Sequence, residues 1–211
     1  MNIAFIGVGQ VGAPLAARLA GAGHSVVIAE SKPGSASVAA ALARDARLSA
    51  RPIAEAVRGA DVVFVAIPFG ANEATLRPLA GELAGKILVD CTNPAGPGLT
   101  HALKSERSGS ELVQSIVPEA KVVKAFTIYG YENFEDPAFP AYDVKPAMFF
   151  CGDDAAAKAR VGELITAVGF EPLDVGGLAQ ALHLEHMTLL WVRMVRVGKR
   201  SPHLVWAALR R

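Results

Sequence analysis

The sequence has few of the residues that build metal sites or disulfide frameworks. It contains two cysteines in 211 residues, Cys91 and Cys151, and they form neither a CxxC pair nor a spacing typical of zinc ligands. A chain of this length can bury about 70% of its unfolded surface, so it needs no covalent or metal cross-link. We therefore expect both thiols to be free and buried, as in a protein of a reducing cytosol.

An excess of charge of one sign is also missing. The 21 lysines and arginines balance 20 aspartates and glutamates, for a formal net charge of +1, which argues against a general nucleic-acid binder. The N-terminus carries no basic leader and no cleavage site, so we expect no secretion signal. The apolar stretch 178–197 contains five ionisable residues, which argues against a membrane span. We expect a soluble, cytoplasmic protein that binds neither nucleic acid nor a membrane.

Apolar runs of strand length alternate with alanine-rich helical stretches, which is typical of a parallel α/β sheet. Strands are predicted at residues 3–6, 26–29, 61–67, 86–90, 121–126, 147–152 and 171–175, and helices at 13–20, 37–44, 53–57, 73–83, 109–117 and 153–169. From residue 178 onward the pattern predicts only helix, broken near 198–202. The predicted fold is a Rossmann doubly wound, mostly parallel sheet over residues 1–176, followed by a small helical C-terminal segment, 177–211, for substrate binding or dimerisation.

The segment GVGQVG, residues 7–12, fits the glycine-rich motif G-x-G-x-x-G. It follows a predicted strand and opens a predicted helix, and Glu30 ends the next strand at nearly the spacing found in dinucleotide-binding proteins. Gly7 permits the tight turn, Gly9 lets the backbone approach a pyrophosphate, and Gly12 lets the helix pack on the strand. The pyrophosphate would then lie at the helix N-terminus. The alternative is a glycine-rich turn without a ligand.

The end of the second strand gives conflicting indications of which dinucleotide binds. A carboxylate at this point, here Glu30, favours the free 2′-hydroxyl of NAD. Ser31 can donate a hydrogen bond to a phosphate oxygen, and Lys32 is a cation suited to the 2′-phosphate of NADP. Glu30 opposes that phosphate only if its carboxylate points at the ribose, and the chain bends here toward Pro33 and Gly34. These residues alone leave NAD(H) and NADP(H) both open.

A dinucleotide site should open at the carboxyl ends of the parallel strands, which are residues 66–69, 91–94 and 125–127. Asn93 is the side chain there that carries both amide donors and an acceptor, and the following proline favours an extended backbone. The alternative is an ordinary Asn-Pro turn. Cys91 also lies near the predicted nicotinamide position. We interpret it as a small packing residue, because no activating partner is visible.

Six segments of the chain carry a family resemblance: IAFIGVGQVG, AGHSVVIA, DVVFVAIP, LVDCTNP…GPGLT, KVVKAF and FFCGDDAAAKARVGELITAVGFEPLDVGGL. They are similar to segments of the NADP oxidoreductases that work with the 8-hydroxy-5-deazaflavin coenzyme F420. The resemblance extends from Met1 to about Glu185. The cytosolic domains of membrane ferric reductases resemble the chain more distantly. The resemblance implies hydride transfer between a nicotinamide and a deazaflavin, which needs little acid–base catalysis and fits the absence of a clear catalytic triad.

The resemblance favours NADP(H) over NAD(H) as the dinucleotide, and we expect a homodimer formed through the C-terminal helices. The residues expected to contact the dinucleotide are Gly7, Gly9, Gln10, Val11, Gly12, Glu30, Ser31, Lys32, Ile67, Pro68, Asn93 and Ala125. On the substrate side we expect Thr127 and His183, with Glu185 as a further candidate. The chain departs from the family here, because Thr127 stands where many members have asparagine or histidine. A flavin, a quinone or a small carbonyl compound stays open as the acceptor, as does a nicotinamide-sensing protein without turnover.

Two groups of ionisable residues follow residue 178. His183 and His186 share one face of the predicted helix, but no third metal ligand is evident, so we expect them to line the cleft or pack in the core. A basic face could hold the phosphodiester and glutamate tail of a deazaflavin, or it could be solvated, which is the favoured interpretation. The basic face consists of Arg193, Arg196 and Arg200. The apolar side of the same helix, which we expect to be buried or to form a dimer contact, consists of Met187, Leu190, Trp191 and Met194.

Overall fold

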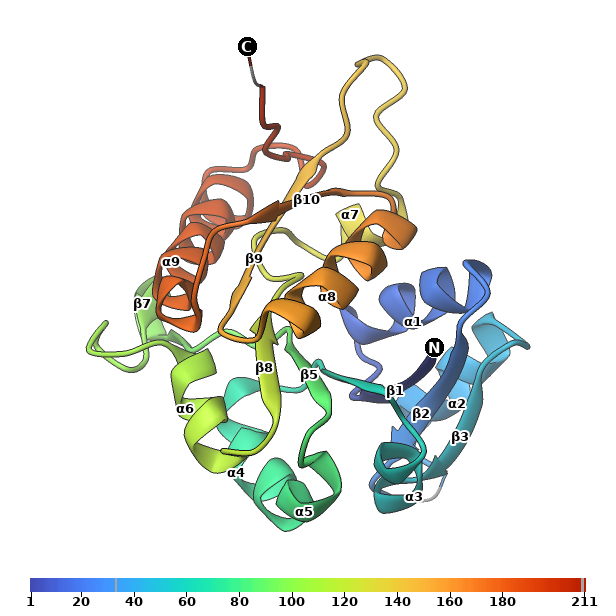
Figure 1. The fold of residues 1–211 in the computed structure, drawn as a ribbon. Helices are drawn as coiled ribbons and strands as arrows, with labels where there is room; N and C mark the ends of the chain where they lie inside the picture. The colour runs from blue at the N-terminus through green and yellow to red at the C-terminus, as the bar shows by residue number, and fades with distance from the viewer. Residues whose placement is uncertain (33, 210) are drawn as a thin grey trace.

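The computed structural model describes residues 1–32, 34–209 and 211, and its helices cover both faces of one central sheet (Figure 1). The strands of this sheet are β1 (Asn2–Ile6), β2 (Ser25–Glu30), β3 (Ser49–Pro52), β4 (Val62–Val65), β5 (Ile87–Asp90), β8 (Lys121–Lys124), β9 (Ala147–Gly152) and β10 (Glu171–Asp174). A separate pair consists of β6 (Ala95–Gly96) and β7 (Thr100–His101). The α-helices are α1 (Gly12–Gly21), α2 (Ala36–Arg44), α3 (Ile53–Arg58), α4 (Asn72–Leu76), α5 (Ala80–Leu83), α6 (Gly109–Ile116), α7 (Glu132–Glu135), α8 (Ala155–Val168) and α9 (Ala181–Val192).

The strands follow the order β10-β9-β8-β5-β4-β1-β2-β3 across the sheet. The strands from β3 to β8 pair in parallel, in the order of a doubly wound dinucleotide-binding sheet. β9 runs antiparallel to β8, and β10 pairs in parallel with β9. The predicted Rossmann doubly wound, mostly parallel sheet is therefore confirmed. The carboxyl ends of β1, β2, β4, β5 and β8 meet at one edge of the sheet, where ligands of such folds bind.

β4 lies in the middle of the sheet and is buried along its whole length, as its continuous apolar sequence predicts. Phe64 faces the core beneath α1 and α8, and its ring stacks on Phe5 with the centroids 4.5 Å apart. Val63 faces the opposite core, to which α3, α5 and α6 contribute. Each fully buried side chain of this kind stabilises the fold by about 1.5–3 kcal/mol. Packing on both faces therefore fixes the strand ends that form the site.

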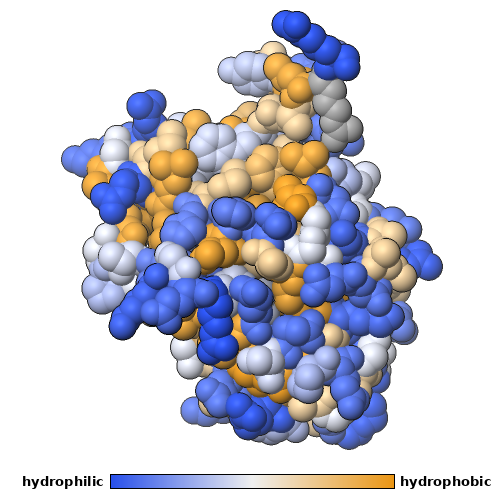
Figure 2. Space-filling model, turned by 60° about the vertical axis from the view of Figure 1, so that its left-hand side comes forward, coloured by the Kyte–Doolittle hydropathy of each residue, from blue (hydrophilic) through white to orange (hydrophobic). Residues whose placement is uncertain are grey.

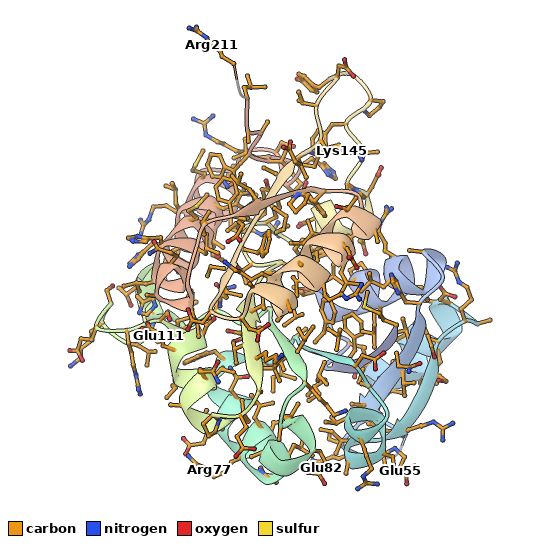
Figure 3. The ribbon with its side chains drawn as sticks, in the orientation of Figure 1. Glu55, Arg77, Glu82, Glu111, Lys145 and Arg211 are labelled. Atoms are coloured by element: carbon orange, nitrogen blue, oxygen red, sulfur yellow. The ribbon has the colours of Figure 1, made fainter. Side chains whose placement is uncertain are left out.

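Charged side chains lie mainly at the periphery of the molecule. Glu55, Arg77 and Lys145 are exposed, and Figure 3 shows them around the outside of the ribbon. Both cysteines are free and buried, as expected. Among the described residues, no helix has the length and apolar character needed to cross a membrane.

The C-terminal segment corrects one sequence prediction. α9 continues into a π-helical turn, η5 (Arg193–Val197), but residues 198–209 are irregular, so the helix predicted beyond residue 202 is wrong. The tail makes other hydrogen bonds instead: Trp191 Nε1 donates to the Leu204 carbonyl at 2.7 Å, and the Ala147 amide donates to the Trp206 carbonyl at 2.8 Å. Because these tail carbonyls already accept hydrogen bonds from α9 and β9, they do not need the partners that a helix would supply. The predicted division of the chain at residue 176 stays a prediction.

Smaller differences have local causes. The helix predicted over residues 73–83 is divided into α4, a 3-10 turn (Arg77–Leu79) and α5, because Pro78 has no N–H to donate within a helix. β3 was not predicted, since its four residues form a short edge strand with exposed side chains. α7 was not predicted either, because a single turn leaves no detectable periodicity.

Candidate functional site

The glycine loop between β1 and α1 is tightly packed at its ends and open in its middle. A Cβ atom on Gly12 would lie 2.1 Å from the Gly7 carbonyl oxygen, and one on Gly7 would lie 2.5 Å from the Ala66 carbonyl oxygen. Gly7 also has φ of +95°. A Cβ atom on Gly9, by contrast, would have no atom within 4 Å. The loop therefore leaves open the one position where a backbone must approach a pyrophosphate closely.

The N-terminus of α1 completes this cradle. Gln10 is exposed and Val11 is half-buried, and no side chain caps the helix at Val11. The first N–H groups of a helix have no intrahelical partner, and with the helix dipole they favour an anion. The loop residues thus fit the phosphates of a dinucleotide, as the sequence motif predicts.

A cavity of about 220 Å³ lies beside the loop, between the ends of β1 and β2. Its walls combine apolar side chains with hydroxyl groups, and they are formed by Ile6, Gly7, Val8, Ala29, Ser31, Ser35, Ser37, Val38, Ile53, Ile67 and Thr75. An apolar cavity with a few polar groups is typical of a ligand subsite. It lies where the adenosine half of a dinucleotide would bind in this fold.

The structure shows where the Glu30 carboxylate goes. Its Oε1 atom accepts a hydrogen bond from the Gly34 amide at 2.7 Å, so this carboxylate is engaged by its own turn. Ser31 lies in the cavity wall, and both Ser31 and Lys32 are exposed. The bend expected at Pro33 lies outside the described residues. The carboxylate that would repel a 2′-phosphate is thus hydrogen-bonded within its own turn.

Two buried oxygens without partners lie after the ends of β5 and β8. Asn93 Oδ1 and Thr127 Oγ1 accept and donate no hydrogen bond among the described residues. Leaving a buried polar atom unpaired costs about 1–3 kcal/mol, so such atoms usually await a ligand or water. Ala125, two residues before Thr127, is buried, Ile67 is half-buried, and Pro68 is exposed after the end of β4. A nicotinamide carboxamide offers a donor and an acceptor that match these two oxygens.

Backbone strain and a helix contact hold Thr127 in place. The preceding residue, Phe126, has φ of +56°, which costs about 1–3 kcal/mol for a bulky side chain. Its ring is buried between Phe64 and Phe134, with centroid distances of 5.8 Å and 6.1 Å. Thr188 Oγ1 on α9 donates to the Thr127 carbonyl at 2.9 Å. The Thr127 hydroxyl is therefore presented by a rigid backbone.

Replacing Thr127 by valine is expected to leave the melting temperature unchanged or raised, because the buried hydroxyl has no partner to lose. We expect kcat/KM for NADPH oxidation to fall about tenfold, equivalent to about 1.4 kcal/mol. Thermal unfolding and steady-state kinetics measure the two effects, and Thr127→Ser is the matched control that keeps the hydroxyl. If Thr127→Val melted several degrees lower with unchanged kinetics, the hydroxyl would be structural.

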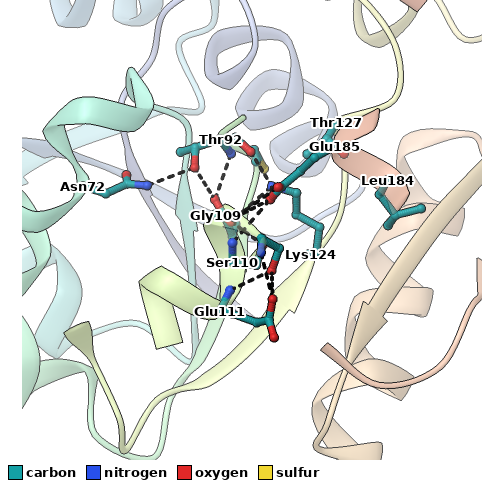
Figure 4. Close-up of polar contacts among 12 residues, drawn as sticks. Asn72, Thr92, Gly109, Ser110, Glu111, Lys124, Thr127, Leu184 and Glu185 are labelled. Atoms are coloured by element: carbon teal, nitrogen blue, oxygen red, sulfur yellow. Dashed lines mark hydrogen bonds and ion pairs between the residues drawn. The ribbon is translucent and has the colours of Figure 1, made fainter. Parts of the chain in front are cut away.

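A buried charge cluster, which sequence analysis missed, consists of Asp90, His101, Lys124 and Glu185. Figure 4 shows Lys124 and Glu185 of this cluster close to Thr127. Lys124 Nζ lies 3.3 Å from Asp90 Oδ2 and 3.1 Å from Glu185 Oε1. Glu185 Oε2 lies 2.8 Å from His101 Nε2, and Glu185 Oε1 accepts the Gly109 amide of α6 at 2.9 Å. Lys124 also donates to the Thr92 carbonyl. The cluster thus joins β5, β8, α6 and α9.

The fields of these charges are visible in neighbouring pKa values. Burial alone would lower the pKa of Lys124, but Asp90 and Glu185 outweigh it and raise that pKa, so Lys124 is an ammonium. Burial, assisted by Asp90, raises the pKa of the Cys91 thiol far above its usual range. Burial likewise raises the pKa of Cys151 to about 12. Both thiols are therefore unreactive at neutral pH.

The histidines on α9 point in a different direction from Glu185. His183 and His186 are exposed, and His186 Nε2 lies 3.1 Å from Ser105 Oγ. Among the described residues, no group of three or more potential ligands could hold a metal ion. Glu185, by contrast, is 1% exposed and lies in the cluster. The role expected for His183 stays a prediction, while Glu185 is placed among buried charges rather than in an open substrate cleft.

Two arginines of the predicted basic face are engaged within the chain. Arg196 pairs with Glu132 at 2.7 Å, and its guanidinium lies 5.2 Å from the centre of the Trp191 ring. Arg193 donates to the Gly98 carbonyl at 3.3 Å. The contacts of Arg196 argue against its holding an acidic coenzyme tail.

Comparisons with known proteins agree with this geometry. The family model described as NADP oxidoreductase, coenzyme F420-dependent, matches residues 2–94. The F420-dependent NADP reductase of Methanocaldococcus jannaschii is 31% identical over an alignment of 208 residues that covers 91% of each chain. A crystal structure from Arthrobacter sp. FB24, provisionally described as an F420-dependent NADP-reductase, superposes with a TM-score of 0.89 at 31% identity and covers 100% of both chains.

A third relative is the metalloreductase STEAP3 of Rattus norvegicus, which is 36% identical over 189 residues. These residues are 89% of this chain but 36% of that protein, so the chain spans about a third of its length. STEAP3 is thus more similar in sequence than the M. jannaschii reductase, contrary to the expected more distant resemblance, whereas the metalloreductase STEAP2 of Mus musculus is less similar, at 26% identity over 189 residues.

Proposed function

Because the chain belongs to the family of coenzyme F420-dependent NADP oxidoreductases, we propose that it transfers a hydride between NADP(H) and a deazaflavin-type acceptor. Membership in this family makes the chain an NADP-dependent oxidoreductase. The observation that carries the proposed acceptor is the 31% identity with the M. jannaschii reductase over 91% of both chains. In the proposed reaction NADPH, oxidised deazaflavin and a proton give NADP⁺ and reduced deazaflavin, or the reverse.

The two cofactors supply the chemistry, and the chain binds and orients them. Backbone N–H groups of the loop formed by residues 7–12 would hold the pyrophosphate, with Gly9 leaving space for it. Asn93 and Thr127 would pair with the nicotinamide carboxamide, beside Ala125, and Ile67 and Pro68 would border the ring. His183 stays the proposed contact on the acceptor side. No step requires a general acid or base on the chain.

The geometry of the β2 end supports NADP(H) over NAD(H). The Glu30 carboxylate, which would otherwise bind a ribose diol, accepts the Gly34 amide instead. Ser31 and Lys32 are exposed beside the adenosine cavity, where a hydroxyl and an ammonium can bind a 2′-phosphate. We propose these two side chains as the phosphate contacts.

Replacing Lys32 by alanine is therefore expected to weaken NADPH binding about tenfold and to leave NADH binding unchanged, a difference of about 1.4 kcal/mol. Calorimetric titration of both dinucleotides measures it, with Lys199→Ala as the control at another exposed lysine. If the wild-type chain binds NADH as well as NADPH, Glu30 holds the ribose and the proposed cofactor is wrong.

A second candidate is reduction of a flavin, and the identity with the metalloreductase STEAP3 favours onward transfer of the electrons to a metal ion. Assays of NADPH oxidation with coenzyme F420, with FAD or FMN, with a quinone and with a small carbonyl compound separate the candidates. Turnover with F420 alone supports the first proposal, and turnover with a flavin alone supports the second. Tight NADPH binding without turnover would indicate a nicotinamide-sensing protein.

We also propose a cytoplasmic homodimer. Figure 2 shows apolar side chains on the upper part of the face nearest α9. Leu190 is 50% exposed and Val197 is 62% exposed, whereas Trp191 is buried within its own chain and cannot form a dimer contact. Sedimentation or light scattering of the purified protein tests this proposal.

A further inference from the structure

The buried charge cluster carries more negative than positive charge. Asp90 and Glu185 are carboxylates and Lys124 is the one lysine between them, so these three groups sum to a formal charge of −1. His101 does not alter the sum: its Nδ1 atom accepts the Ser105 amide at 3.2 Å, which leaves Nε2 to donate to Glu185, as in a neutral imidazole. The N-terminus of α6, which contacts Glu185, offsets about half a charge.

Solvent does not screen this charge. The side chains of Asp90 and Lys124 are 0% exposed, and that of Glu185 is 1% exposed. Buried charges act over longer distances than surface charges, because the effective dielectric constant around them is about 20 rather than 80. Burial raises the pKa of the adjacent Cys91 thiol, with Asp90 adding to this shift and Lys124 opposing it.

The cluster lies directly behind the proposed nicotinamide pocket. Asp90 precedes Asn93 by three residues, and Lys124 precedes Thr127 by three. Successive Cα atoms are about 3.8 Å apart, so the Cα atoms of Asp90 and Lys124 lie within about 11 Å of those of Asn93 and Thr127, respectively. Glu185 joins them through its ion pair with Lys124. The cluster also holds the pocket backbone: Lys124 donates to the Thr92 carbonyl, and Asp90 Oδ1 accepts the Thr92 amide at 2.9 Å.

Resting on the proposed function, we propose that this cluster sets the redox preference of the dinucleotide site by stabilising the oxidised nicotinamide. Loss of a hydride leaves the ring with one positive charge, whereas the reduced ring is neutral. A buried net negative charge therefore strengthens NADP⁺ binding relative to NADPH binding, and it favours hydride donation by bound NADPH. The three ions thus act on the cofactor through their field, without touching it.

The test is the ratio of two dissociation constants, Kd for NADP⁺ divided by Kd for NADPH, measured by calorimetry. Glu185→Gln removes one negative charge while an amide oxygen remains to accept the Gly109 N–H. For a separation on the order of 10 Å between this charge and the ring, and an effective dielectric constant of about 20 to 40, removing the charge changes the ratio about fourfold to sixteenfold. We expect the ratio to rise by that factor. The matched control is Glu106→Gln, an exposed carboxylate whose removal should change the ratio less than twofold.

A second variant separates charge from geometry. In Lys124→Met/Glu185→Gln one charge of each sign is removed, so the formal sum returns to −1 and the ratio should return toward the wild-type value. If Glu185→Gln does not fold, Asp90→Asn removes the same charge from β5 and should raise the ratio in the same direction.

Each remaining outcome overturns the inference. Equal weakening of NADP⁺ and NADPH by Glu185→Gln would show that the cluster only positions the pocket. An unchanged ratio in a folded variant would show that its field does not reach the ring. A wild-type chain that binds neither form would overturn the proposed function as well, whereas an unchanged ratio with tight binding leaves that function intact.

Discussion

Replacing Gly12 by alanine is expected to lower the free energy of unfolding by about 2 kcal/mol or more, while the same change at Gly9 leaves stability unchanged and weakens dinucleotide binding. At Gly12 the new methyl group would lie 2.1 Å from the Gly7 carbonyl oxygen, which is backbone and cannot move aside. Overpacking of this kind costs about 1–3 kcal/mol or more, which exceeds the gain of about 1 kcal/mol that alanine brings to a helix. For a chain of this size, the melting temperature should fall by about 4 °C or more.

At Gly9 the new methyl group meets no atom within 4 Å, so the folded chain accommodates it. It would occupy the space through which a pyrophosphate approaches the backbone, and NADPH should bind about 100-fold more weakly, a change of about 2.7 kcal/mol. Thermal unfolding and NADPH titration of the two variants, side by side, measure the contrast. Unimpaired NADPH binding by Gly9→Ala would mean that the loop is a turn without a ligand.

Replacing Lys124 by methionine is expected to destabilise the fold by about 3–5 kcal/mol, because it leaves the buried carboxylates of Asp90 and Glu185 without their cation. The Thr92 carbonyl would also lose its donor. At about 2–4 °C per kcal/mol for a domain of this size, the melting temperature should fall by about 6–20 °C. Differential scanning calorimetry measures the change, and Lys124→Met/Glu185→Gln should recover part of the loss.

The matched control lies on the same strand. Lys121 pairs with Asp154 at 3.2 Å, but the two side chains are 41% and 34% exposed, so Lys121→Met should cost less than about 1 kcal/mol. Equal effects of the two substitutions would mean that burial of the cluster contributes nothing to its strength.

The fold could be predicted from the sequence, and the residues of the proposed dinucleotide site could be selected from it, because their signals are local. The glycine loop, the acid at the end of β2 and the continuous apolar run of β4 each lie within a short segment. Asn93 and Thr127 could be placed as well, because the ends of parallel strands share one edge of the sheet. The orientation of Glu30 could not, since it depends on a hydrogen bond within its own turn.

The buried cluster was missed because its members come from four separate elements and meet only in the folded chain. One signal was available: Lys124 interrupts the apolar strand KVVKAF, and Asp90 ends the apolar strand ILVD. Charges in buried strands require partners, which would have suggested that these two side chains pair. Glu185 could not be assigned as their third member, because helical periodicity does not show which neighbour a residue faces. The irregular tail was missed for the same reason, since its hydrogen bonds join Trp191 and Ala147 to distant carbonyls.

The attachment of α9 to the sheet has a consequence for motion. A helix tied to β8 and α6 through Glu185, and to the Thr127 backbone through Thr188, cannot swing outward without exposing unpaired ions. The strand ends of the sheet and α9 therefore form one rigid unit. An acceptor that binds between them, as proposed, would meet a surface that is already formed. An acceptor should therefore bind without a conformational change of the chain. Amide hydrogen exchange in α9 should be as slow as in the central strands. If the acceptor binds at α9, as proposed, its choice depends on the side chains that α9 displays and not on a closing lid.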